Sequence, residues 1–174
     1  IMPAARSEWW VGFAWRTNAI GNLIFAKWSD TQNRVQIDLR LTVNGELIIT
    51  RNGTELARSS VGVITAGVWT HIQWYVKIDS VAGASAVRLH GATTPVVEVS
   101  GVNTQATVEP GAIRFDITGW WSEVVVNDNQ GTANNSWPGD VRIDVIQPTA
   151  DGSLAGWTPS TGARYECVRD VPVS

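Results

Sequence analysis

Acidic residues that could work in pairs are the first groups in this sequence to test for chemistry. Hydrolysis of a glycosidic bond needs two carboxyl groups that face each other across that bond. In the segment around Asp144, Arg142 and Gln147 cannot serve as nucleophile or acid. The sequence also has no serine in a nucleophile-elbow pattern and no glycine-rich phosphate loop. We therefore expect no catalytic residue among the best-placed acids, which are Asp38, Glu123, Asp140 and Asp144.

Metal ligands are scarce apart from one oxygen-rich segment. One cysteine and two histidines cannot complete a structural zinc site. Four side chains of the segment 127–140 could offer oxygen ligands to calcium: Asp128, Asn134, Asn135 and Asp140. Asp and Asn are also the usual turn formers. Two interpretations stay open, a calcium site with Asp128 and Asp140 as its carboxylates, or a loop whose geometry these residues determine. We expect no other cofactor.

The ten tryptophans could serve either a core or a ligand. Trp15, Trp28 and Trp74 fall on apolar strand faces and are expected in the core. Trp137 and Trp157 fall in loops, where an indole ring can pack against the protein or stack on a sugar. We keep both interpretations for these two residues, with Asn134 and Asn135 as polar neighbours in the ligand-binding case.

These side chains are placed by strands, which the sequence reveals through apolar and polar residues that alternate with a two-residue period. From Arg34 to Val43 every odd position is apolar and every even position is polar. Successive side chains of a strand point to opposite faces, so the segment is expected to be a half-buried antiparallel strand. Asn44-Gly45 and Asn52-Gly53 follow as hairpin turns in which both residues of each pair adopt positive φ.

Similar patterns recur along the chain and predict about eleven strands and no helix. The further strands are expected at 9–16, 23–28, 46–51, 54–58, 69–78, 87–90, 96–99, 113–117, 123–127 and 141–145. A sheet with one apolar face needs a second sheet to cover it. The predicted fold class is therefore all-β, a two-sheet antiparallel sandwich of the jelly-roll type.

Composition limits the classes of function. The 174 residues are 44% hydrophobic and 17% charged, as in a globular domain, and the net charge is -3. Without a cluster of Lys and Arg we expect no nucleic-acid partner, and without a long apolar stretch we expect no membrane span. The single cysteine, Cys167, indicates assembly in a reducing compartment.

Several segments resemble the laminin G-like, concanavalin A-like jelly roll. The run 67–73, Gly-Val-Trp-Thr-His-Ile-Gln, is similar to a strand of that family, and 87–91 is similar to the hairpin that follows it. Residues 13–16 and 44–47 fit earlier strands. The segment Val124 to Thr158, with Asn134-Asn135 and Gly139-Asp140-Val141-Arg142, is similar to laminin G-like proteins of tailed bacteriophages. The family's paired Asp is replaced by Ser122-Glu123, which weakens any metal site that depends on that pair.

The resemblance implies one laminin G-like domain over residues 1–174, expected to be part of a longer chain. It also implies a non-enzymatic virion protein, either a tail or fibre module or a capsid decoration protein. Its partners would be other virion proteins in a homo-oligomer or repeated array, and it would assemble in the host cytoplasm. The alternative is an adhesion module that binds a glycan of the host surface.

Overall fold

The computed structural model describes residues 7–107, 110–116, 119–130 and 132–139. By compactness the chain divides into one unit, Ile1–Val141, and a second, Arg142–Ser174. All the described residues belong to the first unit, so the single-domain prediction for residues 1–174 stays a prediction. Among the described residues there is no helix that is long and apolar enough to cross a membrane.

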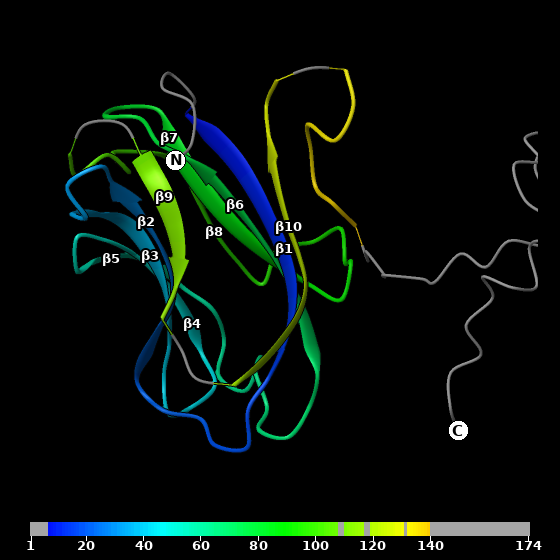
Figure 1. The fold of residues 1–174 in the computed structure, drawn as a ribbon. Coiled ribbons are helices and arrows are strands. Elements are labelled where there is room, and N and C mark those ends of the chain that lie inside the picture. Colours follow the sequence, from blue (N-terminus) through cyan, green and yellow to red (C-terminus); the bar gives the residue numbers. More distant parts are fainter. Residues whose placement is uncertain (1–6, 108–109, 117–118, 131, 140–174) are drawn as a thin grey trace, which may run out of the picture. The chain divides into compact units, whose positions relative to one another are not determined.

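Ten strands form two antiparallel sheets of five strands each (Figure 1). Sheet A has the order β10 (Trp120–Asp128), β1 (Glu8–Arg16), β6 (Thr70–Lys77), β7 (Gly83–Leu89) and β8 (Val97–Val102). Sheet B has the order β5 (Thr54–Arg58), β4 (Leu47–Arg51), β3 (Val35–Leu41), β2 (Leu23–Asp30) and β9 (Pro110–Phe115). The predicted strand at 141–145 lies outside the described residues. The prediction of an all-β, two-sheet antiparallel sandwich is confirmed.

The core lies between the sheets and is rich in aromatic rings. The inner side of β1 contributes Trp9, Val11, Phe13 and Trp15, and all four are buried. Rings from opposite sheets meet there: the ring centres of Phe13 and Phe25 are 5.6 Å apart and those of Trp9 and Trp28 are 5.1 Å apart. The predicted core positions of Trp15, Trp28 and Trp74 are confirmed. Burial of this apolar surface is the main force that holds the two sheets together.

The Asn-Gly turns differ from one another. At Asn52-Gly53 both residues have positive φ, 46° and 85°, as a two-residue hairpin requires. At the other turn only Gly45 has positive φ, at 71°, and its N–H donates to the carbonyl of Thr42. The prediction of two positive-φ residues is therefore wrong for Asn44-Gly45, where the chain between β3 and β4 makes a longer turn.

The polar side of β3 is not the solvent-exposed face that alternation predicts. Gln36 and Asp38 lie on the outer side of sheet B, yet both are buried. The Oε1 atom of Gln36 accepts hydrogen bonds from the backbone N–H groups of Ala106 and Thr107, at 2.7 and 2.8 Å. A connection that leaves β8 thus crosses the end of sheet B and covers polar side chains that the strand pattern alone would leave in water.

Candidate functional site

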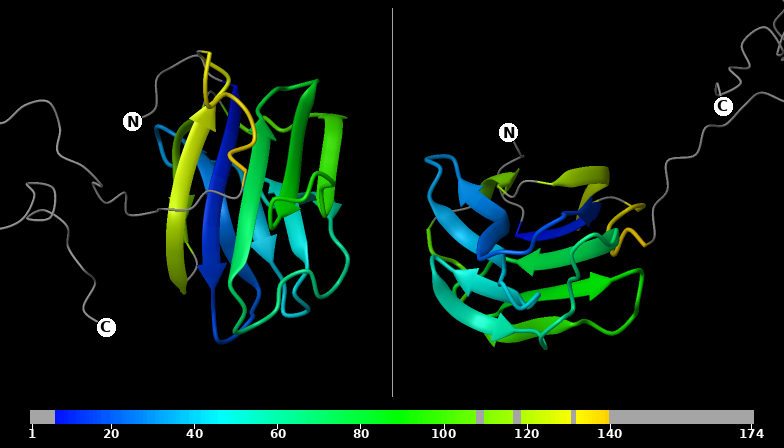
Figure 2. Two further views of the ribbon diagram at one scale, coloured as in Figure 1. Left: turned by 90° about the vertical axis from the view of Figure 1, so that its right-hand side faces the viewer. Right: turned by 90° about the horizontal axis from the view of Figure 1, so that it is seen from below.

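The loop that follows β10 lies against the outer face of sheet A, the face turned away from sheet B. In the left view of Figure 2 this loop, coloured yellow to orange, passes in front of β1 and β6. Its beginning is held by short-range bonds. The backbone N–H of Gln130 donates to Oδ1 of Asp128 at 2.9 Å, and Nδ2 of Asn127 donates to the carbonyl of Ser136 at 3.1 Å. These contacts fold the loop back toward the sheet.

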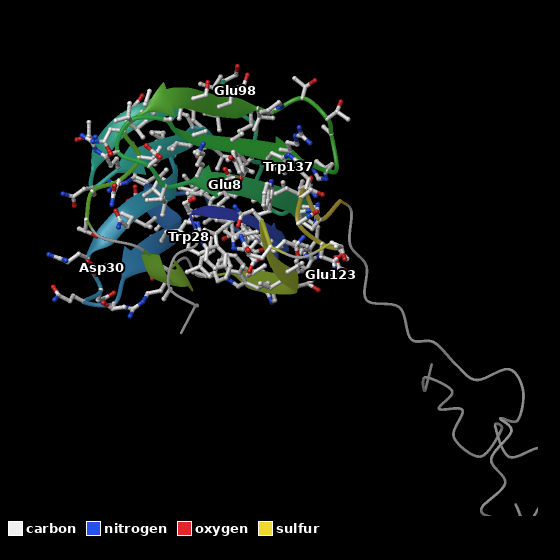
Figure 3. The ribbon with its side chains drawn as sticks, turned by 90° about the horizontal axis from the view of Figure 1, so that it is seen from above. Glu8, Trp28, Asp30, Glu98, Glu123 and Trp137 are labelled. Atoms are coloured by element: carbon white, nitrogen blue, oxygen red, sulfur yellow. The ribbon has the colours of Figure 1, made fainter. Side chains whose placement is uncertain are left out.

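Trp137 is packed into an aromatic cluster on that outer face (Figure 3). Its ring centre lies 6.0 Å from that of Tyr75, and the Tyr75 ring in turn stacks on Trp10 at 5.2 Å. The guanidinium carbon of Arg88 lies 4.0 Å from the centre of the Trp137 ring. Trp137 is half-buried, and these partners come from three strands of sheet A, β1, β6 and β7. The contacts support the packing interpretation of Trp137.

A glycine makes room for the next residue of the loop. A Cβ atom on Gly12 would come within 2.8 Å of Cγ of Pro138, so Pro138 rests directly on the backbone of β1. Beside it, Nε2 of Gln73 donates to the carbonyl of Gly139 at 2.6 Å. His71 of β6 is buried in this region, with its Nε2 3.9 Å from the position of a Cβ on Gly12. The loop therefore covers the middle of the sheet.

Burial raises the pKa of the one phenol in this cluster. Desolvation, with a smaller effect of the carboxylate of Glu8, raises the pKa of Tyr75 to about 12. Tyr75 is thus an uncharged aromatic surface at physiological pH and is unsuited to act as a base.

The other residues of the predicted loop sites differ in how far the structure describes them. Asn134 and Asn135 are exposed, and Asn134 has a φ of 54°, the left-handed conformation that Asn tolerates in turns. Asp128 accepts the backbone bond from Gln130, as a turn former does. Trp157 and Asp140 lie outside the described residues. No group of three or more His, Cys, Asp or Glu that could hold a metal is found among the residues that the structure describes, and the calcium site stays a prediction.

The outer face of sheet B carries ion pairs instead of aromatic rings. Asp38 pairs with Arg40 at 2.9 Å, Asp116 pairs with Lys27, and Arg58 pairs with both Glu46 and Glu55 at 3.1 and 2.7 Å. Burial raises the pKa of Asp38, and the positive charges of Arg40 and Lys27 only partly offset this effect. Asp38 and Arg40 were visible in the sequence as even positions of β3. The ion pair of Glu46 with Arg58 depends on pairing between strands, so the sequence pattern did not predict it.

The spacing of one pair of these acids, Asp38 and Glu46, does not fit glycoside hydrolysis. Asp38 pairs in register with Thr50, and Glu46 lies four residues before Thr50 along the chain. At about 3.4 Å per residue this separates the two carboxylates by roughly 13 Å along the strands. A hydrolase needs a separation of about 5 to 9.5 Å. Glu123 lies at a β-bulge opposite β1 with a φ of 57°. The remaining acids of the sequence prediction, Asp140 and Asp144, lie outside the described residues.

Among the described residues, hollows open on the surface of sheet B, and two of them are large enough to consider. The larger, of about 450 Å³, lies at the end of the sheet beside the Asn44-Gly45 turn. Both guanidinium groups named above, those of Arg40 and Arg58, line it together with Ile24 and Ile48. The smaller, of about 280 Å³, is polar and lies between the β4–β5 turn and Asn103.

Comparison with known proteins adds little beyond the fold. No protein-family model matches the chain, and no curated protein matches it. Among solved structures it is similar to the catalytic domain of a glycoside hydrolase family 131 protein from Coprinopsis cinerea, with 14% sequence identity and a TM-score of 0.42. The alignment covers 79% of this chain and 62% of that domain, so the chain matches less than two thirds of its length. The described part of the protein is a β-sandwich of two antiparallel five-stranded sheets.

Proposed function

We propose that this chain is a non-enzymatic structural protein of a tailed-phage particle that acts through contacts with other protein molecules. The observation that carries the proposal is the edge strand β10. Among the described residues no strand pairs with its outer side, and it exposes Trp120, Val124 and Val126, with 52%, 49% and 39% of their surface accessible. An open edge with large apolar side chains is a ready contact for another protein.

The sequence supports the particle context. The segment that begins in β10 and continues through Asn134-Asn135 is the one that resembles laminin G-like phage proteins. A non-enzymatic role is supported by the ion pairs and hydrogen bonds that already engage the acids of sheet B, above all Asp38, Glu46 and Asp116.

Sedimentation of the purified chain and its edge variants tests the proposal. We expect the chain to sediment as an oligomer and Val126→Lys to shift it toward the monomer, because a buried lysine opposes an apolar contact. Val43→Lys is the matched control, since Val43 is also exposed but lies on the β3–β4 turn of the other sheet. Mass spectrometry of purified particles should find the chain in many copies. A monomer at every concentration, together with absence from particles, would contradict the proposal.

Glycan binding by an adhesion module is the second candidate function. The hollow beside the Asn44-Gly45 turn favours it, because a concave site with apolar walls and a few fixed polar groups is the usual form of a small-ligand site. Glycan arrays test this candidate broadly. Binding that is lost in Trp137→Ala would locate the ligand at the loop site, and silence across a broad array would contradict the candidate.

A further inference from the structure

Four side chains form a row across the outer face of sheet B. Arg40 of β3 pairs in register with Ile24 of β2 on one side and with Ile48 of β4 on the other, and Ile48 pairs with Arg58 of β5. Residues paired in register share a face of the sheet. The row therefore alternates an aliphatic and a guanidinium side chain over four neighbouring strands, and all four line the hollow of about 450 Å³.

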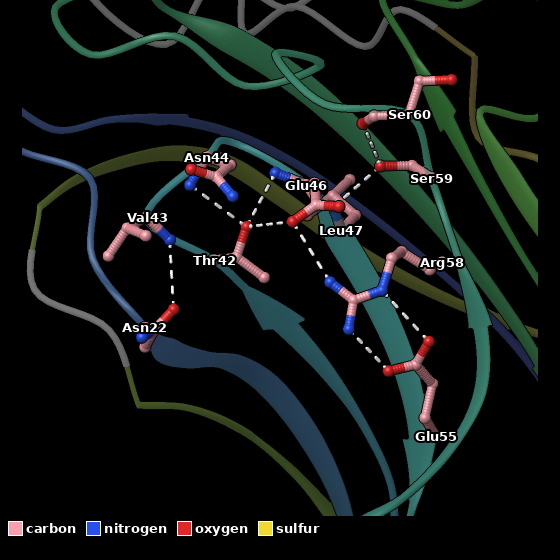
Figure 4. Close-up of polar contacts among 10 residues, drawn as sticks. All are labelled: Asn22, Thr42, Val43, Asn44, Glu46, Leu47, Glu55, Arg58, Ser59 and Ser60. Atoms are coloured by element: carbon pink, nitrogen blue, oxygen red, sulfur yellow. Dashed lines mark hydrogen bonds and ion pairs between the residues drawn. The ribbon is translucent and has the colours of Figure 1, made fainter.

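The polar groups around this row are held in place before any ligand arrives (Figure 4). Arg58 donates to Oε2 of Glu46 from Nη1 and to both carboxylate oxygens of Glu55 from Nε and Nη2. The hydroxyl of Thr42 donates to the same Oε2 of Glu46 at 2.9 Å. At the rim, Oδ1 of Asn22 accepts the backbone N–H of Val43, which turns the Asn22 amide nitrogen away from that bond. Fixed polar groups lose little conformational entropy on binding.

The charges of the hollow are compensated. Arg40 is bonded to Asp38, and Arg58 is bonded to Glu46 and Glu55, so two positive charges face three negative ones. A phosphate, a sulfate or an acidic glycan needs unpaired positive charge, which this row does not offer. The ligand that fits is therefore uncharged and rich in hydroxyl groups.

The aliphatic members of the row supply the second requirement. Ile48 is almost fully buried and Ile24 is half-buried, and they stand on either side of Arg40. A pyranose ring has an apolar C–H side and a rim of hydroxyl groups that both donate and accept hydrogen bonds. Ile24 can receive the C–H side, with Ile48 as part of the apolar floor beside it, while guanidinium N–H groups and carboxylate oxygens bond the rim.

We propose that the hollow formed by Ile24, Arg40, Ile48 and Arg58 binds a single neutral sugar unit of a glycan. The inference rests on the second candidate function and gives it a site on the face of the sandwich opposite to Trp137. The site has no aromatic ring among its lining residues. Because few contacts then support binding, we expect a dissociation constant in the millimolar range for a free monosaccharide.

A titration followed by amide and guanidinium NMR signals tests the site. The probes are free glucose, galactose and mannose and the corresponding N-acetylated amino sugars, each added to the full chain. At least one of them should give saturable shifts at Arg40, Arg58 and the Asn44-Gly45 turn. Sodium sulfate should give none, and the shifts caused by the sugar should persist at high salt, because an uncharged ligand is not screened. Saturation by sulfate, or no saturable shift with any sugar, would overturn the proposal.

Two variants locate the binding. Ile24→Asn removes the apolar contact at a half-buried position, and Asn44→Ala removes a lining amide from an exposed turn where folding is least at risk. Either change should raise the dissociation constant of the sugar, measured from these NMR shifts, at least tenfold. Trp137→Ala, on the opposite face, should leave it unchanged. Shifts that survive both variants in the hollow would overturn the assignment. Loss with Trp137→Ala alone would move the glycan site to the loop and keep the second candidate function.

Discussion

The guanidinium of Arg88 on β7 lies 4.0 Å from the ring centre of Trp137, which belongs to the loop after β10. This contact joins a strand in the middle of sheet A to a segment much later in the chain. It places a positive charge over the face of an indole ring, an arrangement worth about 0.5 to 2 kcal/mol. The loop is thus part of the packed structure of the sandwich, and its stability can be measured residue by residue.

Replacement of Trp137 by alanine should destabilise the protein by about 1–2 kcal/mol. The change removes the contacts of the ring with Arg88 and Tyr75. Urea unfolding measures the loss, and Trp69→Ala is the control, because Trp69 is about half exposed and belongs to neither the loop nor the β10 edge. Equal stability of the Trp137 variant and the parent protein would show that the loop is not held by this ring.

Alanine at Gly12 should displace the loop from the sheet. Its Cβ would come within 2.8 Å of Cγ of Pro138, so Pro138 must shift, and the shift strains the adjacent hydrogen bond from Gln73 to the carbonyl of Gly139. We expect a loss of about 1–3 kcal/mol and faster cleavage by proteases between 129 and 139. Gly21→Ala is the control, because a Cβ there meets only Leu23 at ordinary contact distance. Cleavage at the parental rate in the Gly12 variant would refute the close packing.

Gln36 should be more important for stability than its polar character suggests. Gln36→Leu leaves the N–H groups of Ala106 and Thr107 without their acceptor in a partly buried connection. An orphaned buried donor costs about 1–3 kcal/mol. Thermal or urea unfolding measures the effect, and hydrogen exchange at Ala106 and Thr107 should accelerate. The exposed Gln32→Leu serves as control and should change stability little; a similar loss in both variants would contradict the structural role of Gln36.

Two aspartates should show opposite dependence of stability on pH. Burial raises the pKa of Asp38 above 3.8 in the folded state, so the folded protein holds that proton more tightly than the unfolded chain does. The stabilisation from Asp38 is complete below 3.8 and is lost as pH rises through the elevated value. The backbone N–H groups of Ala82 and Val81 lower the pKa of Asp79, so its stabilisation is present above 3.8 and is lost as pH falls through the lowered value.

Asp38→Asn and Asp79→Asn separate these effects. The free energy of unfolding of the parent protein, relative to Asp38→Asn, should decrease as pH rises from below 3.8 toward neutrality. Relative to Asp79→Asn, the free energy of unfolding of the parent protein should increase as pH rises through the acidic range. Unfolding curves at a series of pH values provide both comparisons. Slopes of the same sign for the two variants would show that burial does not dominate the environment of Asp38.

Much of the architecture follows from local patterns. The alternation of apolar and polar residues in 34–43 predicts β3, and the Asn-Gly pairs predict the turns on either side of β4. Trp15, Trp28 and Trp74 are placed in the core by the same pattern. These features depend on the two-residue period of a strand and on the tolerance of Gly for positive φ, and both act over a few neighbouring residues.

Other features depend on segments that only the folded chain brings together. Gln36 is buried because a connection from β8 crosses it, and Trp137 meets Arg88 because the loop after β10 folds back over the outer face of sheet A. The row of Ile24, Arg40, Ile48 and Arg58 requires the register of four strands at once. The sequence by itself therefore determined which residues form strands and which side of each strand is apolar. The tertiary structure decided which polar residues are covered and which line one hollow, because those properties arise from contacts between residues far apart in the chain.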